Sequence, residues 1–167
     1  MLDLTKEKRM DKITVQDIIE RSGIAKQTFY NHFKDKFDLM NYAYESDTRA
    51  IYENYAQTHD LYGFFCQVGS RFKMNAQFYK HMIRMQGQNV FVNYMFEHTK
   101  HFYLEDLRHK NDGVVIDGRM MIMVDFFTYG ALNICFDWLM MDSTFTVEEM
   151  AEITMACMPP ELKELLL

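Results

Sequence analysis

A short polar stretch, residues 26–31 (KQTFYN), carries side chains that can read the edges of DNA bases. Lys26 and Gln27 have hydrogen-bond donors that suit N7 and O6 of a purine, and the methyl group of Thr28 can contact the methyl group of thymine. Asn31 follows about one helical turn after Gln27. Such side chains on the outer face of a short helix are typical of a segment that enters the major groove.

Two neighbouring residues can hold the phosphate backbone of the same duplex. The hydroxyl of Tyr30 can donate to a phosphate, and Lys36 places an ammonium in the first turn of the next predicted helix, beside free backbone N–H groups. Residues 26–36 carry three lysines and one aspartate, a net charge of +2. The spacing alone leaves an alternative open, in which these residues are the solvated face of a three-helix cap.

Capping residues define the two helices that position this stretch. Thr14 is a good N-cap residue, and Asp17, three positions later, can complete a capping arrangement. Gly23 can take the left-handed position that ends such a helix. A second short helix over residues 25–33 then turns Phe29 inward. Two short helices joined by a glycine turn predict a helix-turn-helix.

A long helix is predicted to link this head to a body of a different composition. Asp35 caps it, and its apolar spacing continues to about residue 59. Beyond residue 60, methionine and aromatic residues dominate. The other predicted elements are a first helix over residues 2–10, a loop over 111–118, a helix over 119–141, a turn over 141–146, a helix over 147–158 and a short tail after Pro160.

The composition is that of an all-α globular protein. The 167 residues are 49% hydrophobic and 25% charged, and two prolines and seven glycines leave few helix breaks. The net charge of −6 gives no overall basic field for nucleic acid. Three widely spaced cysteines and an N-terminus without a signal-peptide pattern predict a cytoplasmic protein. The chain has no glycine-rich phosphate loop and no GxSxG motif, so we expect neither an enzyme nor a cofactor.

Residues 119–141 have the length of a membrane span, but Asp125, Asn133 and Asp137 lie within them. Each central aspartate would cost about 2.5–3.5 kcal/mol in a bilayer. We therefore expect no membrane contact and a helix buried in protein. Because a small domain has too little surface to cover this helix, a second copy should complete a four-helix interface. The candidate interface residues are Gly130, Ile134, Trp138, Met150 and Ile153.

The methionine and aromatic residues of the body permit three interpretations. They form a plain core, line an adaptable apolar pocket for a flat hydrophobic ligand, or sense a protein partner. Asp125 is then either the polar anchor of a pocket, which would favour a cationic ligand, or half of a buried pair. The candidate lining residues are Phe65, Phe78, Met82, Met95, Phe102, Met123, Asp125 and Phe127.

Glu97, His101, Glu105 and His109 recur every four residues and therefore share one helix face. Imidazole and carboxylate groups on one face can bind a divalent metal. Basic residues are interspersed, however, which favours an exposed, ion-paired face. No second carboxylate–histidine helix completes a dinuclear site, so we expect no metal.

Residues 13–40, ITVQDIIERSGIAKQTFYNHFKDKFDLM, resemble the N-terminal signature of TetR/AcrR-family transcriptional regulators. That signature runs from a threonine-led helix through a glycine turn to T-[FL]-Y-x-[HY]-F and a lysine soon after. The helix containing GALNICFDWLMM and the last helix resemble the family's two dimerising helices, most closely in the branch that includes regulators of dihydroxyacetone-kinase operons. The resemblance implies a helix-turn-helix DNA-binding domain over residues 1–45 and a helical ligand-binding and dimerisation domain over residues 46–167.

The resemblance also implies which residues contact DNA. The candidate set is Thr14, Lys26, Gln27, Thr28, Tyr30, Asn31, His32 and Lys36. Two features depart from the family pattern: Ala25 replaces the usual hydroxyl cap of the recognition helix, and the first helix is a turn or two shorter. The expected function is a homodimeric regulator, by family default a repressor, that binds near-palindromic operator DNA and responds to a hydrophobic small molecule or a protein partner. The alternative is an adaptor that kept the fold and lost DNA binding.

Overall fold

The computed structural model describes residues 2–85, 90–111, 114–141 and 144–167. Over these ranges the chain forms ten α-helices and one 3-10 helix, with no strand, which confirms the predicted all-α class. The elements are α1 (Leu2–Glu7), η1 (Met10–Lys12), α2 (Val15–Ser22), α3 (Lys26–His32), α4 (Lys36–Thr58), α5 (Leu61–Met74), α6 (Ala76–Ile83), α7 (Val90–Lys110), α8 (Gly118–Met140), α9 (Val147–Ala156) and α10 (Pro160–Leu166).

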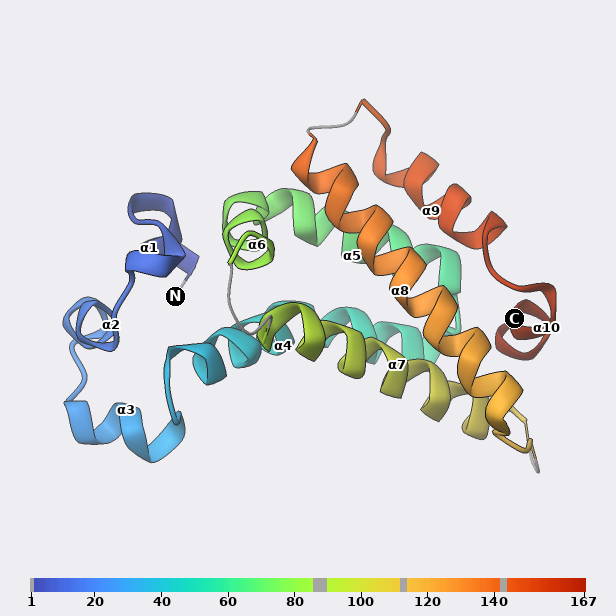
Figure 1. Ribbon diagram of the computed structural model, residues 1–167, viewed down its shortest axis with the longest axis horizontal. Helices are drawn as coiled ribbons and strands as arrows, with labels where there is room; N and C mark the ends of the chain where they lie inside the picture. The colour runs from blue at the N-terminus through green and yellow to red at the C-terminus, as the bar shows by residue number, and fades with distance from the viewer. Residues whose placement is uncertain (1, 86–89, 112–113, 142–143) are drawn as a thin grey trace.

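Helices α1, α2 and α3 form a head at one end of the molecule, and α4 leads from this head into the body (Figure 1). In the body, α5 packs against α4 and α9, while α7 packs against α4 and α8. The C-terminal α10 contacts α7 and α8 at the end farther from the head. The predicted domain boundary after residue 45 falls inside α4.

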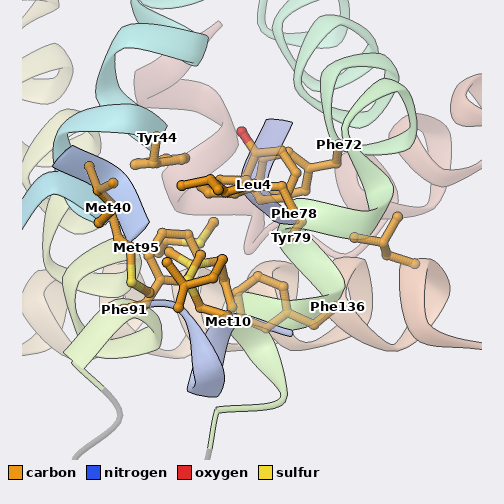
Figure 2. Packing of buried hydrophobic residues seen from close by; sticks show 14 of the residues in the cluster. Leu4, Met10, Met40, Tyr44, Phe72, Phe78, Tyr79, Phe91, Met95 and Phe136 are labelled. Atoms are coloured by element: carbon orange, nitrogen blue, oxygen red, sulfur yellow. The ribbon is translucent and has the colours of Figure 1, made fainter. Parts of the chain in front are cut away.

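One cluster of buried side chains runs from the head into the body (Figure 2). It joins Leu4 and Met10 of the head to Phe78 and Tyr79 of α6, and α1 packs directly on α6. A second cluster fills the other end of the body around Tyr103, between α4, α5, α7, α8 and α10. Because the first cluster is continuous, the head is fixed to the body by packing as well as by α4.

The start of α4 follows from its capping residue Asp35, as the sequence predicts. The carboxylate of Asp35 accepts hydrogen bonds from the backbone N–H groups of Phe37 and Asp38, which satisfies two of the free donors of the first turn. His59 ends the helix in a left-handed conformation, and its N–H donates to the carbonyl of Tyr55. The connector is therefore one continuous helix.

Two sequence predictions at the chain ends are wrong in detail. The first helix ends at Glu7, and a separate 3-10 turn follows over Met10–Lys12. The predicted tail is a helix, α10, which begins with Pro160 at its first position, where proline is well tolerated because its missing N–H would have no partner. Leu162 and Leu166 of this helix are fully buried, so packing stabilises it.

The predicted loop over residues 111–118 and the predicted turn over 141–146 include residues 112–113 and 142–143, which lie outside the described residues. Helix α8 begins at Gly118, with Asp117 as a side-chain N-cap for the N–H of Met120. Helix α9 begins after Thr146, which forms a capping box with Glu149. Both helix starts therefore have the capping chemistry that helix N-termini favour.

Candidate nucleic-acid interface

Helix α2 is fixed at its start by a full capping box. The hydroxyl of Thr14 accepts from the N–H of Asp17 at 3.1 Å, and the carboxylate of Asp17 accepts from the N–H of Thr14 at 2.7 Å. The ammonium of Lys8 contacts the same carboxylate at 2.8 Å. Lys8 and then Thr14 lower the pKa of Asp17 to about 2. Thr14 is exposed, but its hydroxyl and N–H serve this cap.

Gly23 makes the turn between α2 and α3. Its φ of 69° and ψ of 17° lie in the left-handed region, and its N–H donates to the carbonyl of Ile19 at 2.9 Å. This is the position where the absence of a Cβ is required. The turn directs α3 away from α2 and so fixes which face of α3 is exposed.

Gly23→Ala is expected to lower the free energy of unfolding by about 1–2 kcal/mol, because an L-residue pays that amount in the left-handed region. A Cβ at Gly23 would meet no atom within 4 Å, so the whole effect comes from the backbone. Gly118→Ala is the matched control, since a Cβ there also meets nothing within 4 Å and its φ is not positive. Urea unfolding of both variants checks this. Equal losses of unfolding free energy in Gly23→Ala and Gly118→Ala would contradict a left-handed turn at Gly23.

Helix α3 presents the predicted reading residues on one exposed surface. Phe29 is 1% exposed and anchors the helix, with its ring in contact with Tyr30 and Phe33. The amide of Gln27 donates to the side-chain oxygen of Asn31 at 2.9 Å, which holds the two amides as a pair. The exposed residues of α3 are Lys26, Gln27, Thr28, Tyr30, Asn31 and His32.

The N-terminus of α3 lacks a side-chain cap, in line with the unusual Ala25. Ala25 occupies the N-cap position with an extended backbone and accepts no hydrogen bond through a side chain. The first backbone N–H groups of α3 therefore make no hydrogen bond to a side-chain oxygen at the N-cap, which serine or threonine would supply.

The ammonium of Lys36 makes contacts that the sequence interpretation did not include. Its ammonium donates to the backbone carbonyls of Ile13 at 2.8 Å and Met10 at 3.2 Å, and the residue is half-buried. Met10 is the first residue of η1 and Ile13 its C-cap, so Lys36 ties η1 to the start of α4. The ammonium thus makes an internal contact at the position where the sequence predicts a phosphate clamp, because the chain folds those carbonyls back within its reach.

The body contains an apolar cavity of about 70 Å³ between α4, α5, α7, α8 and α9. Of the eight candidate lining residues, Phe65 and Met95 belong to its wall. Phe78 and Met82 are instead fully buried in the cluster that joins head and body, and Phe102 and Phe127 pack in or against the second cluster. Met123 also packs against that second cluster, outside the cavity wall.

Asp125 does not reach the cavity. Its carboxylate forms an ion pair with Lys100 of α7 at 2.6 Å, with the two side chains 36% and 18% exposed. Hydrogen bonding to Asp125 raises the pKa of Lys100. Of the two roles considered for Asp125, the structure shows the ion pair. Asp125 is not part of the cavity wall and gives the cavity no anionic anchor.

Helix α8 exposes an apolar stripe on the surface of the single chain. It is, among the described residues, the one helix long and apolar enough to cross a membrane by length and composition, and 28% of its most apolar window is buried. The large exposed apolar side chains, which we call the stripe, are Ile122, Phe126, Tyr129 and Ile134 of α8 and Met141 directly after it. The expectation of burial is therefore not met within one chain, and several large exposed apolar side chains on one helix are typical of an interaction surface.

The candidate interface residues divide between this stripe and the chain's own core. Gly130 and Ile134 are exposed on α8, while Met150 and Ile153 of α9 are half-buried. Trp138 is 5% exposed, and its indole N–H donates to the carbonyl of Phe145 at 2.9 Å. Trp138 thus packs within one chain, beside Gly69 and Lys73 of α5 and the segment before α9, and does not lie on the exposed stripe.

Two family models match the chain. The model described as bacterial regulatory proteins of the tetR family matches residues 2–43, and one described as a transcriptional regulator C-terminal region matches residues 59–159. The chain belongs to the TetR family. TetR-family proteins are non-enzymatic, DNA-binding transcription regulators that typically dimerise, which confirms the predicted family and the prediction that the chain is not an enzyme.

Solved structures share the TetR fold at low sequence identity. "Dihydroxyacetone kinase operon activator DhaS" is 16% identical with a TM-score of 0.69, over 98% of this chain and 92% of that one. A putative TetR-family transcriptional regulator from Syntrophomonas wolfei str. Goettingen is 22% identical with a TM-score of 0.57, over 99% and 90%. These likenesses show the fold alone. Comparison with curated proteins gives no match.

A polar junction that the sequence did not predict holds the connector helix of this TetR-family chain. The carboxylate of Asp47 in α4 is 8% exposed and accepts from the amide of Asn75 at 3.0 Å and from the hydroxyl of Tyr79 at 2.8 Å. Arg71 lies 3.7 Å from the same carboxylate. Asp47 therefore joins α4 to α5 and α6. No local pattern marks it, because its partners lie more than 20 residues away in the sequence.

The acidic and histidine face of α7 is largely exposed. Glu97, His101 and His109 are exposed, and Glu105 pairs with Arg108 at 2.5 Å. Over the described part of the chain, no group of three or more histidine, cysteine, aspartate or glutamate residues is placed to hold a metal ion.

Proposed function

We propose that the chain is a cytoplasmic, homodimeric repressor whose two α3 helices read the half-sites of a near-palindromic operator. The observation that carries this proposal is the exposed polar surface of α3, which Phe29 holds outward from the core. The amide pair of Gln27 and Asn31 offers donors and acceptors to base edges, and Lys26 stands beside it. Tyr30 and His32 supply contacts to the phosphate backbone.

The exposed stripe of α8 supports the homodimer. A second copy that buried Ile122, Phe126 and Ile134 would remove these side chains from water, which yields about 25 cal/mol for each Å² of apolar surface. Two copies related by a two-fold axis present two α3 helices. Half-sites would then be spaced by about 34–36 Å, or a multiple of it.

An effector response requires that the body alter the position of the heads. The cavity wall includes Tyr44 and Tyr52 of α4, the helix that leads to the head. A hydrophobic ligand or a protein partner that changes the packing of α4 would change the separation of the two α3 helices. Coupling of this kind is typically about 1–3 kcal/mol.

The test is selection of binding sites from a random duplex pool, followed by affinity measurements with variants. We expect an inverted repeat, and Gln27→Ala should cost about 1–3 kcal/mol at one base position and relax the preference there. Gln67→Ala, an exposed glutamine on α5 in the body, is the matched control and should bind as the wild type does. Selection of no sequence, or an unchanged preference in Gln27→Ala, would contradict α3 as the reading helix.

A second candidate function is an adaptor that has lost DNA binding. Two observations favour it. The ammonium of Lys36 donates to backbone carbonyls of the chain itself, and Ala25 gives α3 no side-chain cap. An adaptor predicts that the purified dimer shows no salt-sensitive affinity for any duplex.

A further inference from the structure

We infer that a small organic dianion, a phosphate monoester or a dicarboxylate, binds between the head and the body, where η1 faces the end of α6. An open pocket of about 680 Å³ lies there, and pockets that hold small molecules typically measure about 300–1,000 Å³. Its described lining residues are Arg9, Met10, Asp11, His81, Arg84 and Met85. None of them belongs to the wall of the apolar cavity in the body. The inference goes beyond the proposed function and does not depend on it.

The charge of the pocket wall favours an anion. Arg84 is exposed, and its guanidinium forms no ion pair with a described residue. Arg9 is exposed as well, and its Nε donates to the carboxylate of Asp11 at 3.0 Å. With a neutral histidine, the described wall therefore has a net charge of +1, in a chain whose net charge is −6. Guanidinium groups suit phosphate and carboxylate oxygens, because their N–H groups can donate two parallel hydrogen bonds.

His81 adds a charge that depends on pH to the same wall. Burial lowers the pKa of His81, the positive charges of Arg84 and Arg9 lower it further, and Asp11 opposes them. The Nδ1 atom of His81 is buried and has no hydrogen-bond partner among the described residues. A bound dianion would offset the repulsion from the two guanidinium groups and raise the pKa of His81. Binding should therefore take up a proton and become tighter as the pH falls.

Two methionines supply the apolar part of the wall and are held by the core. Met10 is 1% exposed in the cluster that joins head and body, and the half-buried Met85 packs against that cluster. Lys36 donates to the carbonyl of Met10 at 3.2 Å, and Met82, three residues before Met85, is fully buried. Both sides of the pocket are thus in place before a ligand binds, which lowers the entropic cost of binding. An acidic group joined to a short carbon skeleton matches this wall.

A ligand in this pocket would contact the head and the body at the same time. Arg9 directly precedes η1, and His81 and Arg84 lie at the end of α6, the helix on which α1 packs (Figure 1). Like charges that line one pocket repel each other, and a dianion between them turns this repulsion into attraction. Binding should therefore stabilise the contact between head and body and raise the Tm of the protein.

Isothermal titration calorimetry of the purified protein with phenyl phosphate and with glutarate tests the site. Benzyl alcohol and glutaramide, which lack the negative charges, are the matched neutral probes. We expect saturable binding of at least one dianion, and the tighter of the two identifies the acidic group of the ligand. Its neutral counterpart should bind at least about tenfold more weakly. Added salt should weaken the binding of the dianion, since the two guanidinium groups are exposed.

Four variants at exposed positions localise the binding. Arg84→Gln and Arg9→Gln each remove one guanidinium group and should weaken binding of the dianion about tenfold. Arg108→Gln is the matched control, because Arg108 also pairs with a nearby carboxylate but does not line the pocket, and it should bind as the wild type does. Asp11→Asn removes the one described carboxylate of the wall and should tighten binding about threefold or more.

The pH dependence separates His81 from the arginines. The probe is 1,3-propanedisulfonate, which stays doubly charged between about pH 7.5 and about pH 5, the range in which histidine titrates. Its affinity should rise as the pH falls through the lowered pKa of His81, because the imidazolium adds a positive charge to the wall. In His81→Gln this rise should be absent, and an equal rise in this variant would contradict the role of His81.

Three results would overturn the inference: no saturable binding of either dianion, a neutral probe that binds as tightly as its dianion, or unchanged binding in both Arg84→Gln and Arg9→Gln. The affinity of Arg84→Gln for duplex DNA is measured on the same preparations. A loss of duplex affinity in a protein that binds no free dianion would also overturn the inference, and it would assign Arg84 to the phosphate backbone of DNA. Binding of the dianion by a protein that binds no duplex would leave the site standing and contradict the proposed function.

Discussion

Phe29→Ala is expected to lower the free energy of unfolding by about 3–5 kcal/mol and to abolish DNA binding. Phe29 is 1% exposed and is the side chain that anchors α3 to the head. Its removal loses the transfer free energy of the ring and leaves a cavity beneath the reading surface. Because Phe29 belongs to the cluster that continues into α6, we expect one cooperative transition shifted to lower denaturant, and not a separate early unfolding of the head.

Urea unfolding, monitored by circular dichroism, measures this loss of stability. Phe29→Leu is the matched control, since it keeps an apolar side chain there and should cost less than about 1.5 kcal/mol. A loss below about 1 kcal/mol in Phe29→Ala, or two separate transitions, would contradict a core shared between head and body.

Asp47→Ala is expected to cost about 3 kcal/mol, the second largest effect. The substitution leaves the amide of Asn75 and the hydroxyl of Tyr79 without their acceptor, and each unpaired buried group costs about 1–3 kcal/mol. Arg71 also loses its partner, but this guanidinium is 35% exposed and water can solvate it, so its loss adds little.

Asp47→Asn separates charge from hydrogen bonding at this junction. Its side-chain oxygen can still accept from Tyr79, so it should retain part of the stability that Asp47→Ala loses. Ser46→Ala, at the exposed neighbouring position, should be close to neutral. We also expect Asp47→Ala to weaken any effect of an effector on DNA affinity, because α4 is then less firmly joined to α6. Equal stability of Asp47→Ala and the wild type would contradict the claim that Asp47 joins α4 to α5 and α6.

Capping residues and helical periodicity predicted the helices of the head well. The pair Thr14 and Asp17, the left-handed Gly23 and the cap Asp35 each place a helix end within a residue or two, because capping depends on neighbours in the sequence. The inward position of Phe29 followed from helical periodicity in the same way. These residues determine which face of α3 is exposed, so the surface that carries the candidate site could also be predicted.

Contacts between distant segments could not be predicted. Lys36 meets carbonyls more than 20 residues earlier, and Asp125 meets Lys100 across two helices. In both cases the pairing depends on tertiary packing and not on spacing. Trp138 lies in an apolar helix whose every side looked suitable for an interface, and the positions of α5 and of the segment before α9 decide that this side is internal. The same limit explains why just two of the eight candidate lining residues reach the cavity.

The most direct test of the central claim is the affinity of the purified protein for the promoter DNA upstream of its own coding sequence, measured at two salt concentrations. The account predicts tight binding by two chains per site and a linear fall of log K with log salt concentration, since lysine contacts to phosphates release counterions. Lys26→Ala should make this salt dependence less steep by about one unit of slope if Lys26 contacts a phosphate, or relax one base preference if it contacts a base. An affinity that is absent, or that does not change with salt, would contradict the account.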